Sequence, residues 1–90
     1  MYYVHGEKCI KCDILEDAVY TFLAMGGYNQ GYKSIGIEYE ANGLPCACDV
    51  IVMYGGKEVL LSNDYRYCDV SIDVDAWKNA VKFINKYLNF

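Results

Sequence analysis

Apolar residues recur along the first third of the chain at two different spacings, which predict a strand followed by a helix. The short apolar run from Tyr2 to His5 predicts a strand buried on both faces. Between Asp13 and Met25 apolar residues return every three or four positions, which predicts a helix capped by Asp13 and ended by Gly26 and Gly27. Residues 6–12 between these elements are predicted to form a connection.

The pattern in the rest of the chain predicts three more strands, the last two of which form a β-hairpin, and then a second helix. Residues 33–40 alternate between apolar and polar, as in a half-buried strand, and Asn42-Gly43 marks a turn. The continuous apolar run 50–54 predicts a central strand, which Gly55-Gly56 connects to residues 57–62 in a β-hairpin. Residues 63–71 fit either a loop or a short extra strand.

The chain is expected to close with a helix that Asp73 caps and that runs to about Leu88. Its apolar stripe consists of Trp77, Ala80, Val81, Ile84 and Leu88. The order of elements predicts one α+β domain of two layers over residues 1–90. If the first two long strands pair in parallel, the first helix is their right-handed crossover.

Composition and charge narrow the classes of function. Hydrophobic residues make up 54% of the chain and charged residues 22%, a balance that excludes intrinsic disorder. The net charge of −4 argues against binding to nucleic acid, whose phosphates call for cations. No apolar run approaches a membrane span, and no export signal is visible. We therefore expect a cytoplasmic protein with neither nucleic acid nor membrane as a partner.

Cys9-Ile10-Lys11-Cys12 is the motif with the clearest chemistry, because it stands between a predicted strand and a predicted helix. A thiol at a helix start lies near unpaired amide donors and the positive end of the helix dipole, which favours the thiolate. Lys8 and Lys11 add positive charge nearby. Cys9 is therefore the expected nucleophile, and Cys12 is the thiol expected to resolve a mixed disulfide. The same spacing also occurs in zinc sites, so metal binding stays open.

The segment from Tyr3 to Glu16 resembles the opening of the glutaredoxins and small thioredoxin-like proteins. The predicted hairpin at 50–61 and the closing helix stand where that fold has its own. The resemblance implies a thioredoxin-like order β-α-β-β-β-α and a thiol–disulfide oxidoreductase with Cys9 attacking and Cys12 resolving. It further implies that Pro45 is the counterpart of the family's cis-proline. Its implied partners are a protein disulfide substrate or a reductase, with glutathione as a candidate reductant.

Cys46 and Cys48 follow Pro45 directly. In a thioredoxin-like fold this segment packs against the CxxC motif, so Cys9, Cys12, Cys46 and Cys48 would converge. Four converging thiolates suit zinc or an iron–sulfur cluster. The two pairs could instead pass a disulfide between them. A third alternative places Cys46 or Cys48 in the core as a small hydrophobic residue.

A non-catalytic function is the main alternative to the enzyme. A small acidic protein with ten tyrosines could mask a basic surface of a larger partner, as phage-encoded inhibitors do. The tyrosines could equally be strand residues that pack half-buried. We expect Cys68 to be structural and His5 to be a hydrogen-bonded core residue. Three hypotheses result: a dithiol oxidoreductase, a protein-interaction module and a four-cysteine metal site.

Overall fold

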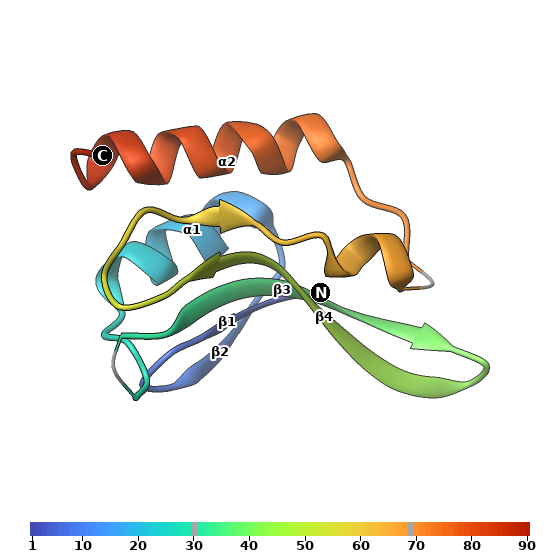
Figure 1. The fold of residues 1–90 in the computed structure, drawn as a ribbon. Coiled ribbons are helices and arrows are strands. Elements are labelled where there is room, and N and C mark those ends of the chain that lie inside the picture. Colours follow the sequence, from blue (N-terminus) through green and yellow to red (C-terminus); the bar gives the residue numbers. More distant parts are fainter. Residues whose placement is uncertain (30, 69) are drawn as a thin grey trace.

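The structure, a computed structural model, describes residues 1–29, 31–68 and 70–90. Its strands are β1 (Tyr2–His5), β2 (Cys9–Cys12), β3 (Lys33–Ala41), β4 (Leu44–Met53) and β5 (Leu60–Leu61). Its helical elements are α1 (Leu15–Ala24), the 3-10 turn η1 (Asp64–Tyr67) and α2 (Val74–Tyr87). The strands form one 5-stranded sheet in the order β2-β1-β3-β4-β5, with every neighbouring pair antiparallel (Figure 1). The prediction of a mixed α+β fold is confirmed.

The β2 strand is the main departure from the predicted order. Residues 9–12 do not form a connection, because they pair with β1 as an edge strand, with Tyr2 opposite Cys12 and His5 opposite Cys9. This hairpin reverses the chain before α1, so β3 joins β1 antiparallel rather than parallel. The helix α1 instead connects β2 to β3, which lie on either side of β1. The predicted order β-α-β-β-β-α is therefore wrong at its start.

The helix α1 is confirmed, but its ends differ from the prediction. Its N-cap is Ile14 in an extended conformation, and no side chain caps it, so Asp13 does not have the predicted capping role. At the other end Lys33 Nζ donates to the carbonyl oxygens of Phe22 (2.6 Å) and Met25 (2.9 Å). An ammonium here also meets the negative end of the helix dipole. A lysine from the sheet thus holds the end of α1.

The strands β3 and β4, with 9 and 10 residues, form the longest hairpin of the sheet. Asn42 and Gly43 have φ angles of 53° and 76°, as the predicted tight turn requires. The strand β4 begins well before the predicted position 50, and its Pro45 pairs opposite Glu40 near the turn. The register shifts between Ile35 and Gly36, which leaves Val50 as an extra residue in a bulge.

Both helices cover the same face of the sheet. Val4, Ile35 and Ile51 occupy one row across three strands, and all are fully buried in a cluster shared with both helices. The contributions from α2 are Trp77, Ala80 and Ile84, as its stripe predicted. In the parts of the chain that the structure describes, no helix covers the opposite face, which we call the open face (Figure 1).

The second half of the chain otherwise follows its predictions. The hairpin of β4 and β5 pairs Ile51 with Leu61 and Val52 with Leu60. The ambiguous segment 63–71 contains η1 rather than a strand in its described part. The helix α2 begins as predicted, because the Asp73 side chain accepts a hydrogen bond from the Ala76 amide at 3.2 Å. Among the described residues, no helix is long and apolar enough to cross a membrane.

Candidate functional site

The structure places the CxxC motif on an edge strand and not at the start of a helix. Along a strand, side chains alternate between faces, so residues three apart point to opposite sides. Cys9 lines a hollow on the open face, whereas Cys12 Sγ lies 3.7 Å from Thr21 Oγ1 of α1. Three residues of strand separate the two Cα atoms by about 10 Å, beyond the roughly 7 Å that a disulfide spans. The predicted geometry of attacking and resolving thiols is therefore not present.

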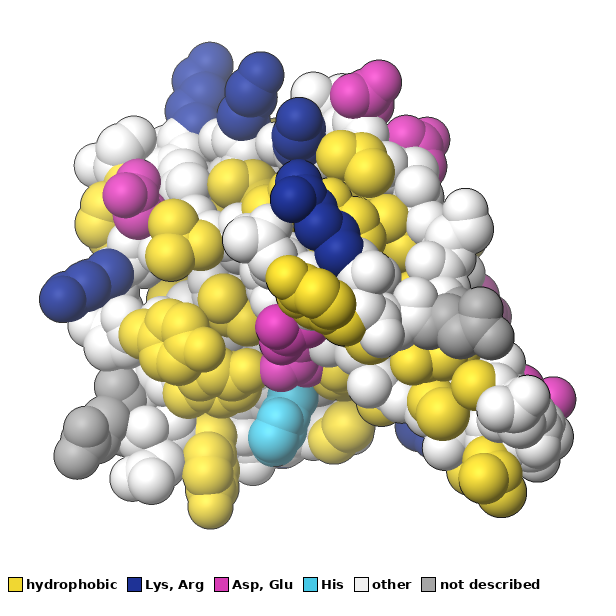
Figure 2. Space-filling model, turned by 45° about the vertical axis from the view of Figure 1, so that its right-hand side comes forward, with side chains coloured by type: hydrophobic (Ala, Val, Ile, Leu, Met, Phe, Trp, Pro, Cys, Tyr) yellow, Lys and Arg dark blue, Asp and Glu magenta, His cyan; other side chains and the backbone are white. Residues whose placement is uncertain are grey.

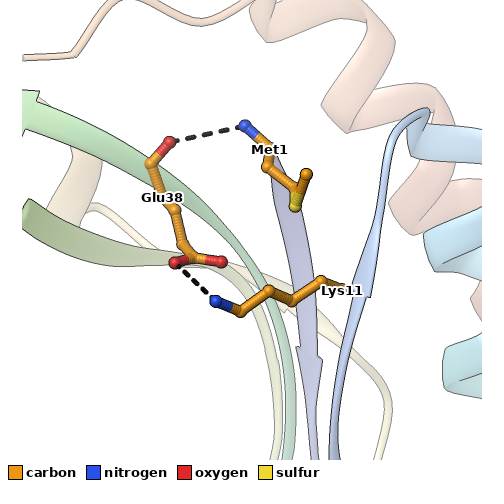
Figure 3. Close-up of polar contacts among 3 residues, drawn as sticks. All are labelled: Met1, Lys11 and Glu38. Carbon is orange, nitrogen blue, oxygen red and sulfur yellow. Dashed lines mark hydrogen bonds and ion pairs between the residues drawn. The ribbon is translucent and has the colours of Figure 1, made fainter.

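The two lysines that were expected to activate the thiols do not have that role in the structure. Lys8 is exposed in the connection between β1 and β2. Lys11 Nζ lies 3.3 Å from Glu38 Oε2, so its charge is engaged across the sheet (Figure 3). The amino group of Met1 lies 3.5 Å from the carbonyl oxygen of the same Glu38. These contacts direct the positive charge toward Glu38 and not toward a thiolate.

Pro45, Cys46 and Cys48 lie on β4, which is separated from β2 by the two strands β1 and β3. Three strand spacings correspond to about 14 Å. The peptide bond before Pro45 is trans, which differs from the predicted cis-proline. The predicted convergence of the four thiols is therefore wrong. In the described part of the chain, no group of three or more His, Cys, Asp and Glu side chains is arranged to hold a metal ion.

The open face instead brings together a carboxylate and two tyrosines. Tyr3 lies across Gly36, where a Cβ atom would come within 2.2 Å of the Tyr3 ring. Its hydroxyl donates to Asp49 Oδ1, and the Tyr32 hydroxyl donates to Asp49 Oδ2 at 2.6 Å. Burial, followed by the Asp49 carboxylate, raises the pKa of both phenols above their ordinary value. Both tyrosines are therefore neutral donors at physiological pH.

A row of aromatic rings extends from the Asp49 carboxylate and its two tyrosines to one end of the sheet. The His5 ring stacks on Tyr28 with centroids 6.0 Å apart and meets the edge of Tyr32 at 6.4 Å. Tyr32 in turn lies 5.2 Å from Tyr54. His5 is exposed, so its predicted place in the core is wrong. In Figure 2 the histidine side chain lies at the surface beside acidic and hydrophobic side chains.

A hollow of about 360 Å³ lies between this centre and β2. We call it the acidic hollow; it is lined by Tyr3, His5, Cys9, Lys11, Glu38, Ala47 and Asp49. Glu38 Oε2 is paired with Lys11, but Glu38 Oε1 is buried and has no hydrogen-bond partner in the described part of the chain. A buried acceptor without a donor costs about 1–3 kcal/mol. The lining of the hollow therefore contains one carboxylate oxygen whose hydrogen-bonding capacity is unused.

Sequence reasoning identified Cys9 and Lys11 but missed Tyr3, Glu38 and Asp49 as parts of one site. The signal in the sequence that could have grouped them is the two-residue spacing of a strand, which puts Tyr3 on one face with His5 and Glu38 on one face with Glu40. The pairing of β1 with both β2 and β3 was needed to join them. No protein-family model, curated protein or solved structure matches this chain. The resemblance to glutaredoxins therefore stays a prediction.

Proposed function

We propose that the protein is a non-catalytic interaction module whose open face binds an arginine side chain of a basic protein partner. The observation that carries this proposal is the unpartnered Glu38 Oε1 inside the acidic hollow. A guanidinium group supplies N–H donors in a planar fork, and charge-assisted hydrogen bonds to a carboxylate are the strong ones. Arginine thus supplies what the hollow lacks.

The surroundings of Glu38 suit a guanidinium better than an ammonium ion. Aromatic faces at His5 and Tyr3 lie in or beside the hollow, and a guanidinium stacks on such rings. Asp49 adds a second carboxylate to the same lining. Lys11 is 60% exposed, so its side chain is free to move toward solvent when a second cation enters.

The charge of the whole chain supports a basic partner. With a net charge of −4, the protein attracts cationic surfaces and repels phosphate backbones. Buried aromatic residues and arginines are the side chains that dominate binding energy at protein interfaces. A basic partner with a protruding arginine is therefore the occupant that fits both the charge and the aromatic row.

Thiol–disulfide exchange by Cys9 and Cys12 stays a prediction, but the structure gives it less support. A bond between these sulfurs requires β2 to leave its pairing with β1. Its test is the reduction of a model disulfide by the protein, with a Cys9→Ser variant as the control. Reduction that depends on Cys9 would favour the enzyme over the interaction module.

The binding proposal is tested by titrating the labelled protein with N-acetyl-arginine amide and following amide NMR shifts. We expect millimolar ligand to shift the amides of Tyr3, His5, Cys9 and Glu38. The uncharged isostere N-acetyl-citrulline amide should leave them in place. Absence of shifts at these residues, or equal shifts with citrulline, would overturn the proposal.

Two matched variants separate a specific site from general attraction to an acidic protein. Glu38→Gln should weaken binding of the arginine probe about tenfold, a loss of about 1.4 kcal/mol, because the carboxylate charge is removed. Glu40→Gln removes the same charge from the same strand at an exposed position outside the hollow. It should leave the affinity nearly unchanged. Equal losses in both variants would mean that only net charge matters.

A further inference from the structure

A second group of thiols lies away from the acidic hollow, where β4 packs against η1. Cys46 and Cys48 are two residues apart on β4, so their side chains share a face, and they pair opposite Tyr39 and Ile37 of β3. Cys68 directly follows η1 as its C-cap. The fold thus brings Cys68 to the strand that carries Cys46 and Cys48.

The Cys48 and Cys68 side chains are neighbours. Cys68 ends η1, which packs on β4. Its thiol is close enough to raise the pKa of both the Cys48 thiol and the Tyr39 hydroxyl. Cys48 is only 4% exposed, whereas Cys68 is half-buried and its Sγ donates to the Asp64 carbonyl oxygen at 3.2 Å. Burial, and then the neighbouring Cys68, raises the pKa of Cys48. Cys68 is therefore the thiol of this pair that solvent reaches.

We propose that Cys48 and Cys68 form an intramolecular disulfide when the protein meets a small disulfide such as oxidised glutathione. This site is independent of the acidic hollow and of the binding proposal. The bond would tie the centre of β4 to the end of η1 and enclose the turn and β5 between them. It would convert a pair of free thiols into a covalent link across the surface of the sheet.

The reaction has two steps that balance. The Cys68 thiol releases its proton to solvent, and its sulfur attacks one sulfur of oxidised glutathione; the glutathione S–S bond breaks, leaving a Cys68–glutathione mixed disulfide and one glutathione thiolate. Cys48 then gives its proton to that thiolate, and its sulfur attacks Cys68 Sγ and displaces the second glutathione as a thiolate that takes a proton from solvent. Two protein thiols are oxidised and one small disulfide is reduced to two thiols.

The other cysteines lack this arrangement. Cys9 and Cys12 point to opposite faces of β2. Cys46 Sγ lies 3.7 Å from the carbonyl oxygen of Leu44, near the turn of the hairpin and two residues along β4 from Cys48. Selective formation of one bond is therefore expected, although five thiols are present.

The test treats the reduced full chain with oxidised glutathione, alkylates the remaining thiols and maps peptides by mass spectrometry without reduction. We expect a cross-linked peptide pair containing Cys48 and Cys68, with Cys9 and Cys12 alkylated or carrying glutathione. A predominant Cys46–Cys68 link, glutathione adducts without any cross-link, or random pairing would each overturn the proposal. The wild-type map requires no variant, so a folding defect cannot obscure it.

Variants give an independent measurement. Cys68→Ser should abolish the cross-link and leave only alkylated Cys48, because the half-buried position tolerates serine. Cys12→Ser removes a thiol of similar exposure on β2, at the opposite edge of the sheet, and should leave the yield unchanged. The oxidised wild-type protein should also melt at a higher temperature than the reduced protein, because the bond restricts the unfolded chain. A lower melting temperature after clean Cys48–Cys68 formation would contradict the geometry from which we argue.

Discussion

Lys33 and Glu38 lie on the same strand, β3, but their charged groups face opposite sides of the sheet and differ in how far they are hydrogen-bonded. On the covered face Lys33 is 9% exposed, and its ammonium donates to two carbonyl oxygens at the end of α1. On the open face Glu38 has one oxygen paired with Lys11 and the other buried without a donor. The charge that serves the fold is satisfied within the chain. The charge on the open face keeps one acceptor oxygen unpaired among the described residues.

The largest expected effect on stability is that of a substitution at Gly36, on the open face. In Gly36→Ala the new Cβ would lie 2.2 Å from the Tyr3 ring and 2.5 Å from the Cys48 carbonyl oxygen. Backbone atoms cannot move away easily, so we expect a loss of about 4 kcal/mol in the free energy of unfolding. Urea denaturation followed by Trp77 fluorescence measures it. The control is Ala47→Ser at an exposed position of β4, and wild-type stability in Gly36→Ala would mean that Tyr3 does not cross the sheet there.

The next largest effect concerns the satisfied charge. Lys33→Met keeps the long side chain but removes the donor to the Phe22 and Met25 carbonyls and the cation that lies 4.3 Å from the Phe22 ring. We expect a loss of about 2 kcal/mol in the free energy of unfolding. Lys57→Met removes an exposed charge and should change it little. Equal stability of the two variants would show that Lys33 does not hold the end of α1.

A third effect depends on pH and concerns the hydroxyls that face Asp49. Burial and Asp49 raise the pKa of Tyr3 and Tyr32 above the ordinary value of 10.0, so their contribution to stability is complete below pH 10.0 and is lost as the pH rises further. Tyr3→Phe should cost about 1.5 kcal/mol at neutral pH. It should also flatten the decline in stability above pH 10.0, which urea denaturation across the alkaline range measures.

The effect of Lys33 on stability must be distinguished from the effect of the tyrosines in that alkaline range. Burial lowers the pKa of Lys33, so its loss of a proton favours the folded state as the pH rises toward 10.5. The tyrosine effect has the opposite sign. Comparing Tyr3→Phe with its parent, both in the Lys33→Met background, isolates the phenol. An unchanged alkaline decline in that pair would exclude Tyr3 as its source.

The smallest expected effect sharpens the comparison most. Glu38→Gln removes an exposed ion pair with Lys11 and also the buried charge without a donor. These changes oppose each other, so the free energy of unfolding should change by less than about 0.5 kcal/mol. Thermal denaturation measures it beside the binding titration. A loss as large as that of Lys33→Met would mean that Glu38 serves the fold after all.

The local periodicity in the sequence was sufficient for four elements. The apolar run 2–5, the helical spacing over 13–25, the glycine turn at 55–56 and the stripe around Trp77 all correspond to observed elements. In each case the pattern extends over enough residues, or ends in a turn, to favour one backbone conformation. These elements define the α+β class and most of the core.

The Cys9–Cys12 segment shows where that reasoning fails. Four residues carry too little periodicity to distinguish a connection from an edge strand, and a strand at the edge is specified by its partner. A strand β1 followed directly by α1 would have placed the two cysteines at the helix start. Pairing with β1 instead turns their sulfurs to opposite faces, while Cys48 and Cys68, far apart in the chain, become neighbours.

By itself the sequence determined which segments fold locally, the net charge of −4 and the supply of thiols and tyrosines. Only the tertiary structure decided which of these side chains meet. Strand order and register place Tyr3, Glu38 and Asp49 in one hollow, and the packing of η1 on β4 brings Cys48 to Cys68. The physical reason is that contacts between distant segments depend on pairing and burial summed over the whole sheet, whereas helices and turns depend on neighbours along the chain.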